Sequence, residues 1–211
     1  AYEIVSRDWS SDVCSSDLAC SRFDPTSDLM RLCVTPGVPV TASALLFEAV
    51  QFAVAVAAES GGAYDPTIGA TMADHGFDRA YRTGERVAMP ASDAAASWRD
   101  VVVDVEARTI TLARPLVLDL GALAKGLAID LAARELQPFE DFVVDAGGDL
   151  FASGHNADGE PWRVGIRNPR ASGNVIETLA VSGAAVCTSG DYERRNEAGH
   201  HLLDKIGRAH V

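Results

Sequence analysis

Residues Leu118–Gly126 read LDLGALAKG, and the segments on either side of this motif decide the fold class. The apolar run Pro115–Leu120 is typical of a short strand. Residues Ala122–Leu136 then have the composition of a helix that stops before Pro138, because proline cannot continue a helix. The motif therefore predicts a strand that leads directly into a helix.

The rest of the chain predicts helices and strands in separate stretches. Residues Thr41–Ser60 are mostly apolar, begin with hydroxyl side chains and end at a glycine pair, which predicts one long and largely buried helix. Two β-branched runs, Val101–Val105 and Thr109–Ala113, predict a hairpin. Further short strands are expected at Phe142–Ala146, Leu150–Ser153, Trp162–Arg167, Val175–Val181 and Ala184–Thr188. This segregation of strands from helices predicts an α+β fold.

Composition bounds the class of protein. With 211 residues, of which 47% are hydrophobic and 23% charged, the chain can bury one sizeable core, and a single compact domain is the default expectation. The net charge of −12 and the lack of a Lys/Arg cluster argue against binding to a nucleic-acid backbone. The most apolar run, Ala42–Ala58, is shorter than the roughly 20 residues of a membrane helix and contains Glu48 and Gln51. No secretion signal is visible, although a missing N-terminus would hide one.

Two terminal segments are unlike the rest of the chain. Asp8–Leu18 reads DWSSDVCSSDL, and the last seven residues read KIGRAHV. The DNA string GACGTGTGCTCTTCCGATCT encodes DVCSSDL, and its reverse complement, preceded by A, encodes KIGRAHV. The string resembles a common sequencing-library adaptor. We therefore expect natural protein only from about residue 19 to residue 204, with residues 1–18 and 205–211 non-native.

Cysteine usage gives no sign of a metal site. Cys14 lies in the suspected adaptor segment, so the remaining cysteines are Cys20, Cys33 and Cys187, whose spacing is not that of metal ligands. We expect all three to be buried thiols.

Two segments in the first part of the chain could contact a ligand. In GGAYDPTIG, Gly61–Gly69, the glycines permit close backbone approach to a ligand, although a helix end followed by an Asp-Pro turn explains them equally well. In LDLGALAKG, Lys125 lies in the first turn of the expected helix, where the helix dipole favours an anion. The lysine therefore contacts a phosphate or is simply solvated. Asp119 could orient the ribose or ring of a ligand, or could cap the helix.

Three later segments have similar alternatives. In VVDAGGDLFASG, the pair Gly147-Gly148 could form an N–H hollow for an anion or a plain β-turn. In CTSGDYERR, Arg194 and Arg195 could bind a phosphate or form surface ion pairs. The segment HHLLD, His200–Asp204, holds histidines near a carboxylate, and such histidines are more often structural than catalytic.

The order of these segments resembles one known family. SRF, GAYDPTIG, DLGALAKG, AGGD, WRVGI, TSGDYER and HLLD follow one another between Ser21 and Asp204, as in the FAD:protein FMN transferases of the ApbE type. The resemblance implies a single ApbE-like, T-fold-related domain with mixed or antiparallel sheets and packed helices. It also implies transfer of FMN from FAD to a Thr or Ser of an acceptor protein, such as a subunit of a bacterial redox complex, with Mg²⁺ and release of AMP.

The resemblance assigns roles to particular residues. Positions that match the family's FAD contacts are Phe23, Ala63, Tyr64, Asp65, Asp119, Lys125 and Leu203. Ala122 matches a metal ligand that acts through its carbonyl, and His201 matches the candidate base that accepts the proton of the acceptor hydroxyl. Members of the family are bacterial and many face the cell exterior, so the compartment of this protein stays open.

The sequence also departs from the family pattern. Lys-Ile-Gly-Arg follows Asp204 in place of Pro-x-Thr-Gly, and the downstream metal-binding segment and the upstream Met-Gly-Thr strand are not in this sequence. Gly69–Asp78 lacks the Pro and Trp of the usual pattern. We therefore expect the activity of the parent protein rather than of this fragment. An FAD pyrophosphatase, a non-catalytic FAD-binding protein and glycine turns with a purely structural role remain the alternatives.

Overall fold

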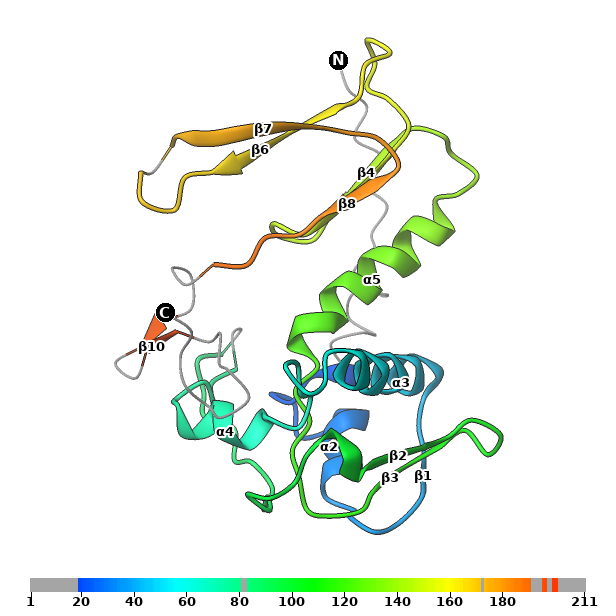
Figure 1. The fold of residues 1–211 in the computed structure, drawn as a ribbon, viewed down its shortest axis with the longest axis vertical. Coiled ribbons are helices and arrows are strands. Elements are labelled where there is room, and N and C mark those ends of the chain that lie inside the picture. The colour runs from blue at the N-terminus through cyan, green and yellow to red at the C-terminus, as the bar shows by residue number, and fades with distance from the viewer. Residues whose placement is uncertain (1–18, 81–82, 172, 191–194, 197–198, 201–211) are drawn as a thin grey trace. The chain divides into compact units, whose positions relative to one another are not determined.

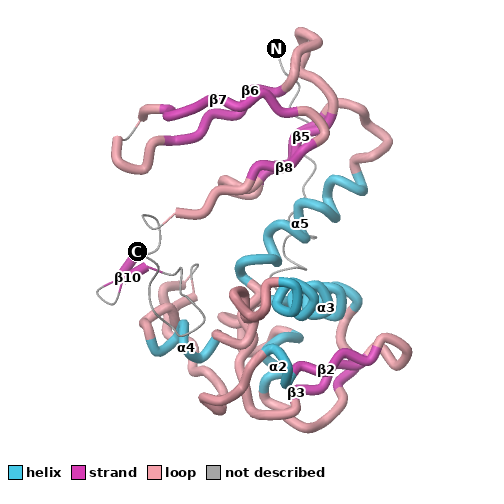
Figure 2. The backbone as a smooth tube through the Cα atoms, in the orientation of Figure 1, coloured by secondary structure: helices cyan, strands magenta, loops and turns pink. Residues whose placement is uncertain are grey.

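The computed structural model describes residues 19–80, 83–171, 173–190, 195–196 and 199–200. These residues fall into two compact units, of which the first contains the chain up to Ala124 together with the short segment from Arg195 onward, and the second is Lys125–Arg194. Figures 1 and 2 show the course of the backbone and its helices and strands. The expected limits of natural protein, residues 19 and 204, stay a prediction.

The first unit combines short helices with one antiparallel sheet. Its elements are α2 (Asp28–Cys33), β1 (Val40–Thr41), α3 (Ala44–Glu59), α4 (Gly69–Asp74), the 3₁₀ turn η1 (Trp98–Asp100), β2 (Val101–Asp104) and β3 (Thr109–Leu112). The strand order is β1-β3-β2, with both pairs antiparallel. A further antiparallel pair, β9 (Arg195–Asn196) with β10 (Gly199–His200), belongs to the same unit.

The core of this unit lies between the helices and the sheet. Helix α3 begins after Ser43, whose hydroxyl accepts a hydrogen bond from the Leu46 amide. Leu46 and Val50 on α3 are buried, as are Ile110 and Leu112 on β3. Figure 1 shows α2 and α3 beside the β1-β3-β2 sheet. Burial of each such side chain stabilises the fold by about 1.5–3 kcal/mol, so this apolar layer holds the unit together.

The second unit contains most of α5 (Gly121–Glu135) and two small sheets. The strands β4 (Phe142–Asp145), β5 (Leu150–Ser153) and β8 (Ala184–Val186) form an antiparallel sheet in the order β4-β5-β8. The strands β6 (Trp162–Arg167) and β7 (Val175–Val181) form a separate antiparallel pair with an irregularity between Ile166 and Arg167.

Most expected elements are confirmed with small changes at their ends. The helix expected at Thr41–Ser60 begins only at Ala44, because Val40 and Thr41 pair with β3 and Ser43 caps the helix. The hairpin, the helix after Gly121 and the five later strands are present. The six-residue helices α2 and α4 were not anticipated, since so few residues show no reliable periodicity.

The strand expected at Pro115–Leu120 is wrong as a regular strand. This segment makes only an isolated parallel bridge, between Val117 and Ile68, and no ladder among the described residues. Its apolar side chains are nevertheless buried: Leu116, Val117 and Leu118 are each 0% exposed. The hydrophobic pattern therefore reported burial correctly but not hydrogen bonding to a neighbouring strand.

Within the part of the chain that the structure describes, no helix has both the length and the apolar character needed to cross a bilayer.

Candidate functional site

The motif GGAYDPTIG lies side by side with the Leu118–Ala124 part of LDLGALAKG in the first unit. The Asp119 amide donates to the carbonyl of Pro66 at 2.7 Å, and the Gly69 amide donates to the carbonyl of Val117 at 3.0 Å. A Cβ on Gly69 would lie 2.7 Å from both Val117 Cγ1 and the Val117 carbonyl oxygen. Glycine at position 69 therefore allows the two segments to approach this closely.

The carboxylate of Asp65 organises the turn of the first motif. Its Oδ1 accepts hydrogen bonds from the amide of Thr67 at 2.9 Å and from the Thr67 hydroxyl at 2.7 Å. Its Oδ2 accepts a hydrogen bond from the Trp98 amide at 3.3 Å. One oxygen therefore closes the turn and the other ties it to η1, while Ala63 is exposed and Tyr64 is half-buried. A ligand contact through the backbone of this turn stays a prediction.

Asp119 is held from two sides. Its Oδ1 accepts a hydrogen bond from the Gly121 amide at 2.8 Å, at the first residue of α5. Its Oδ2 lies 2.6 Å from Nε of Arg22 in an ion pair, with the two side chains 17% and 4% exposed. Arg22 also donates through Nη2 to the Phe77 carbonyl at 2.7 Å and covers the ring of Phe23 at 4.1 Å. Of the two roles left open for Asp119, helix capping is thus observed.

Two buried hydrogen-bond donors border the first motif and have no partner among the described residues. They are the hydroxyl of Tyr64 and Nε1 of Trp98. Trp98 Nε1 would lie 3.2 Å from a Cβ built on Gly62, which has a positive φ of 83°. An unmet buried donor costs about 1–3 kcal/mol, so such donors indicate that a ligand with acceptor atoms, or ordered water, completes the site.

Burial raises the pKa of the Tyr64 hydroxyl well above its usual value, and the negative charges of Asp119 and Asp65 raise it further. Tyr64 therefore stays protonated at neutral pH and is available as a donor. Asp65 and Asp119 are both near enough to act on this hydroxyl through their charge, so a ligand here would meet a neutral donor close to two carboxylates.

In the second unit, Lys125 pairs with the aspartate that follows the glycine pair Gly147-Gly148. Lys125 Nζ lies 2.7 Å from Asp149 Oδ2, so the lysine is ion-paired although it is 47% exposed. The amides of Gly147 and Gly148 donate to Oδ1 of Asp145 at 2.9 and 3.2 Å. The hollow suggested for an anion is therefore occupied by a side chain of the same turn, which supports the plain-turn alternative.

The turn of the second unit is also tied to the strand end that precedes TSGDYER. The Thr188 amide donates to Oδ1 of Asp149 at 3.2 Å, and its hydroxyl donates to the Gly148 carbonyl at 3.1 Å. Motifs that lie about forty residues apart in the sequence thus meet at Asp149. Asp149 links Lys125 and Thr188, and a ligand phosphate at Lys125 would compete with this carboxylate.

The metal assignment finds little support in the described residues. Ala122 lies in the first turn of α5, and no three His, Cys, Asp or Glu side chains that the structure describes are grouped to hold a metal ion. His201 and Leu203 lie outside the described residues. Of the cysteines, Cys20 and Cys33 are buried as expected, but Cys187 is exposed, because β8 ends before it.

Sequence reasoning missed two residues of the first unit. Arg22 stands in the quoted SRF motif but received no role, because its burial and its pairing with Asp119 depend on packing that the sequence does not show. Trp98 gave no signal, because its place beside Gly62 and Asp65 depends on long-range packing.

The fold and these motifs define the class of protein. A model of the ApbE family matches residues 5–208, and the chain belongs to the ApbE family. An FAD:protein FMN transferase of Treponema pallidum (strain Nichols) is 34% identical over 197 residues, which cover 80% of this chain and 52% of that protein. Another, of Vibrio cholerae, is 30% identical over 183 residues, which cover 81% of this chain and 54% of that protein.

A solved structure confirms the α+β fold. The crystal structure of the ApbE protein from Thermotoga maritima matches 94% of this chain and 67% of its own chain, with a TM-score of 0.80 and 27% identity. The chain spans about half the length of the curated relatives it matches here.

Proposed function

We propose that the protein containing this chain transfers FMN from FAD to a Thr or Ser side chain of an acceptor protein and releases AMP. Membership of the ApbE family and relatives named FAD:protein FMN transferase support this proposal. The structural observation that carries it is the pairing, in the first unit, of GGAYDPTIG with the segment that leads into α5, where Tyr64 offers a buried donor without a partner among the described residues.

The chemistry of the described residues fits a nucleotide substrate in the first unit. FAD presents ribose hydroxyls, ring nitrogens and carbonyls, which can accept from Tyr64 and donate to Asp119. Phe23 provides an aromatic surface, and the exposed Ala63 leaves its backbone accessible. Lys125, which pairs with Asp149 in the second unit, keeps its proposed pyrophosphate contact from its place in the motif alone.

The proposed reaction is an in-line displacement at phosphorus. The hydroxyl oxygen of the acceptor attacks the FMN phosphorus of FAD, its proton passes to His201, and the bond from that phosphorus to the bridging oxygen breaks, so AMP leaves. The product is a phosphoester between FMN and the acceptor side chain. His201 lies outside the described residues, so its role rests on the motif alone.

Mg²⁺ is part of the proposal as the ion that offsets charge on the pyrophosphate, with the Ala122 carbonyl as one ligand. The described residues do not provide the rest of a coordination shell, so they do not by themselves fit the ion.

The test uses the protein expressed from its complete reading frame. It is incubated with FAD, Mg²⁺ and a candidate acceptor, and protein and nucleotides are then analysed by mass spectrometry. FMN on the acceptor together with free AMP supports the transferase. Free FMN with AMP would replace it with a pyrophosphatase, and bound but unchanged FAD would replace it with a non-catalytic flavin-binding protein. A Lys125→Ala variant should bind FAD more weakly, and unchanged affinity would remove the pyrophosphate contact from the proposal.

A further inference from the structure

Arg22 connects three segments of the first unit through one buried guanidinium. Nε pairs with the Asp119 carboxylate at 2.6 Å, Nη2 donates to the Phe77 carbonyl at 2.7 Å, and the guanidinium carbon lies 4.1 Å from the centre of the Phe23 ring. The arginine is only 4% exposed. A buried arginine with this geometry has a fixed orientation, because its planar fork matches only one arrangement of acceptors.

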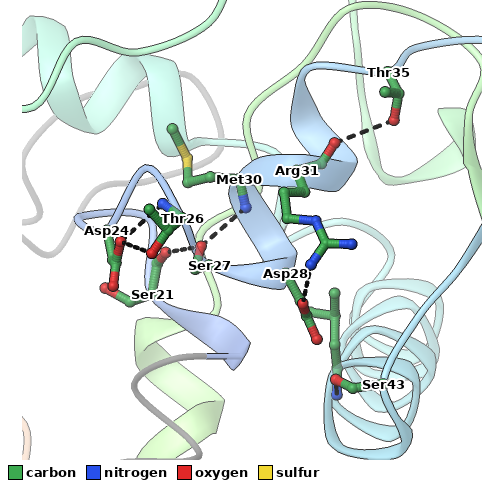
Figure 3. A network of polar contacts seen from close by, with 10 residues as sticks. Ser21, Asp24, Thr26, Ser27, Asp28, Met30, Arg31, Thr35 and Ser43 are labelled. Atoms are coloured by element: carbon green, nitrogen blue, oxygen red, sulfur yellow. Dashed lines mark hydrogen bonds and ion pairs between the residues drawn. The ribbon is translucent and has the colours of Figure 1, made fainter.

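The turn that carries Arg22 is itself fixed by short-range hydrogen bonds. The Ser27 hydroxyl donates to the Ser21 carbonyl at 2.6 Å and accepts from the Met30 amide at 3.0 Å, at the start of α2. Asp24 accepts from both the amide and the hydroxyl of Thr26. Figure 3 shows this network around the beginning of α2. The backbone on either side of Arg22 is thus anchored independently of Asp119.

The Asp119 carboxylate has no orientational freedom left once Arg22 is in place. Oδ1 is occupied by the Gly121 amide and Oδ2 by Arg22, so the pair sets the plane of the carboxylate at the start of α5. Nη1 of Arg22 is buried and has no hydrogen-bond partner among the described residues. An Arg22–Asp119 ion pair that served only the stability of the fold would gain nothing from a buried Nη1 without an acceptor.

We propose that Arg22 is a positioning residue, which fixes the Asp119 carboxylate in the orientation needed to bind the flavin nucleotide. This inference rests on the proposed function, because it assumes that Asp119 contacts FAD. It assigns Arg22 an action through Asp119 rather than a general contribution to folding.

A double-mutant cycle on FAD affinity tests this assignment. The variants are Arg22→Met, Asp119→Asn and the double substitution, in the protein expressed from its complete reading frame, with FAD dissociation constants measured by the change in flavin fluorescence. Each single substitution should weaken binding about 10- to 100-fold, the range for a hydrogen bond to a charged group. The double variant should bind within about twofold of the weaker single variant, because the two residues act as a unit.

Arg31→Met is the matched control. Arg31 lies on α2, is 70% exposed and pairs with Asp28 at 3.2 Å, so the control removes an equal charge and an ion pair from the surface of the same unit. The control should leave FAD affinity unchanged. A global electrostatic effect on the ligand would instead weaken binding in both arginine variants and would overturn the assignment.

The remaining outcomes separate this inference from the proposed function. Wild-type protein that does not bind FAD would overturn the proposed function and the inference with it. If the wild-type protein binds FAD and Arg22→Met binds it with the same affinity, the inference alone would be overturned. The same holds if the losses of affinity in the two single variants multiply in the double variant. If Arg22→Met does not fold, Arg22→Lys replaces it, because lysine keeps the charge but lacks the planar fork that holds Asp119 and Phe77 in one fixed arrangement. Arg22→Lys and Asp119→Asn must then show the same non-additive effect on the FAD dissociation constant.

Discussion

At the scale of single residues, Cys33 links burial to the pH dependence of stability. It is 1% exposed on α2, and burial raises the pKa of its thiol to about 11 from a reference of 9.0, although a hydrogen bond from the Leu118 amide acts in the opposite direction. The unfolded chain therefore releases this proton at lower pH than the folded chain. The contribution of Cys33 to stability is complete below about pH 9 and is lost as the pH rises through about 11.

We expect wild-type protein to lose more stability than Cys33→Ala between about pH 8 and about pH 11, by up to about 3 kcal/mol for two pKa units. The free energy of unfolding, measured in urea at several pH values, checks this. The two proteins are compared by how steeply the free energy of unfolding falls with pH, because Cys33→Ala also creates a cavity that lowers stability at every pH. Tyr64 titrates in both proteins and does not affect the difference. Parallel pH profiles would contradict the prediction.

Residues also show where sequence reasoning reached its limit. Asp119 was recognised as a helix cap or ligand contact, because a carboxylate directly before a helix has few other uses. Its partner Arg22 lies 97 positions away, and no local pattern joins the two. The Gly147-Gly148 turn was recognised, but the choice between anion site and plain turn depended on whether Asp145 folds back onto the amides, which only the structure shows.

At the scale of elements, the limits of helices were more predictable than the pairing of strands. Ser43 and Pro138 mark helix ends through local chemistry, whereas Pro115–Leu120 lacks a strand neighbour for reasons found elsewhere in the chain. This segment packs against the turn of residues 66–69 instead, and its backbone bonds go to Pro66 and Gly69, with others to Asp93 and to the sulfur of Cys33. Hydrophobic pattern reports burial, while ladder formation requires a partner strand at the right place.

The packing of this segment gives the second prediction, Gly69→Ala. The added methyl group would approach Val117 Cγ1 and two backbone carbonyls, at 2.7 Å for Val117 and 3.1 Å for Leu118. Backbone cannot move aside as a flexible side chain can, so we expect a loss of about 1–3 kcal/mol. Gly126→Ala is the control, because Gly126 lies in α5 with nothing within 4 Å of its built Cβ.

The control should stabilise α5 by about 0.5–1 kcal/mol, since alanine is the better helix former. Thermal unfolding of both variants and the wild type checks the pair. Equal midpoints for the two variants would show that the segments 66–69 and 116–119 are not packed as closely as the structure indicates.

At the scale of the whole molecule, burial is divided unequally between the two units. Among the described residues, the buried apolar side chains of the second unit are Ile129, Ala133, Ala152 and Val181, and all the others belong to the first unit. Composition predicted that the chain could bury a sizeable core, but not that the core would be concentrated before residue 125. That division depends on long-range contacts that no local signal carries.

Unequal burial predicts unequal local stability, which hydrogen exchange of the 211-residue chain can measure. The amides of β3 lie in the centre of a three-stranded sheet with Ile110 and Leu112 fully buried, whereas β6 and β7 form a two-stranded pair with Val175 and Ile176 more than half exposed. An isolated pair of strands is marginally stable in water, and protection reflects the free energy of local opening. We therefore expect amides of β6 and β7 to exchange at least tenfold faster than those of β3 under conditions where reclosing is faster than the chemical exchange step, so that exchange rates report the free energy of opening. Equal protection in both places would mean that the β6–β7 pair opens only with the core of the first unit, so the two units would unfold together despite their unequal burial.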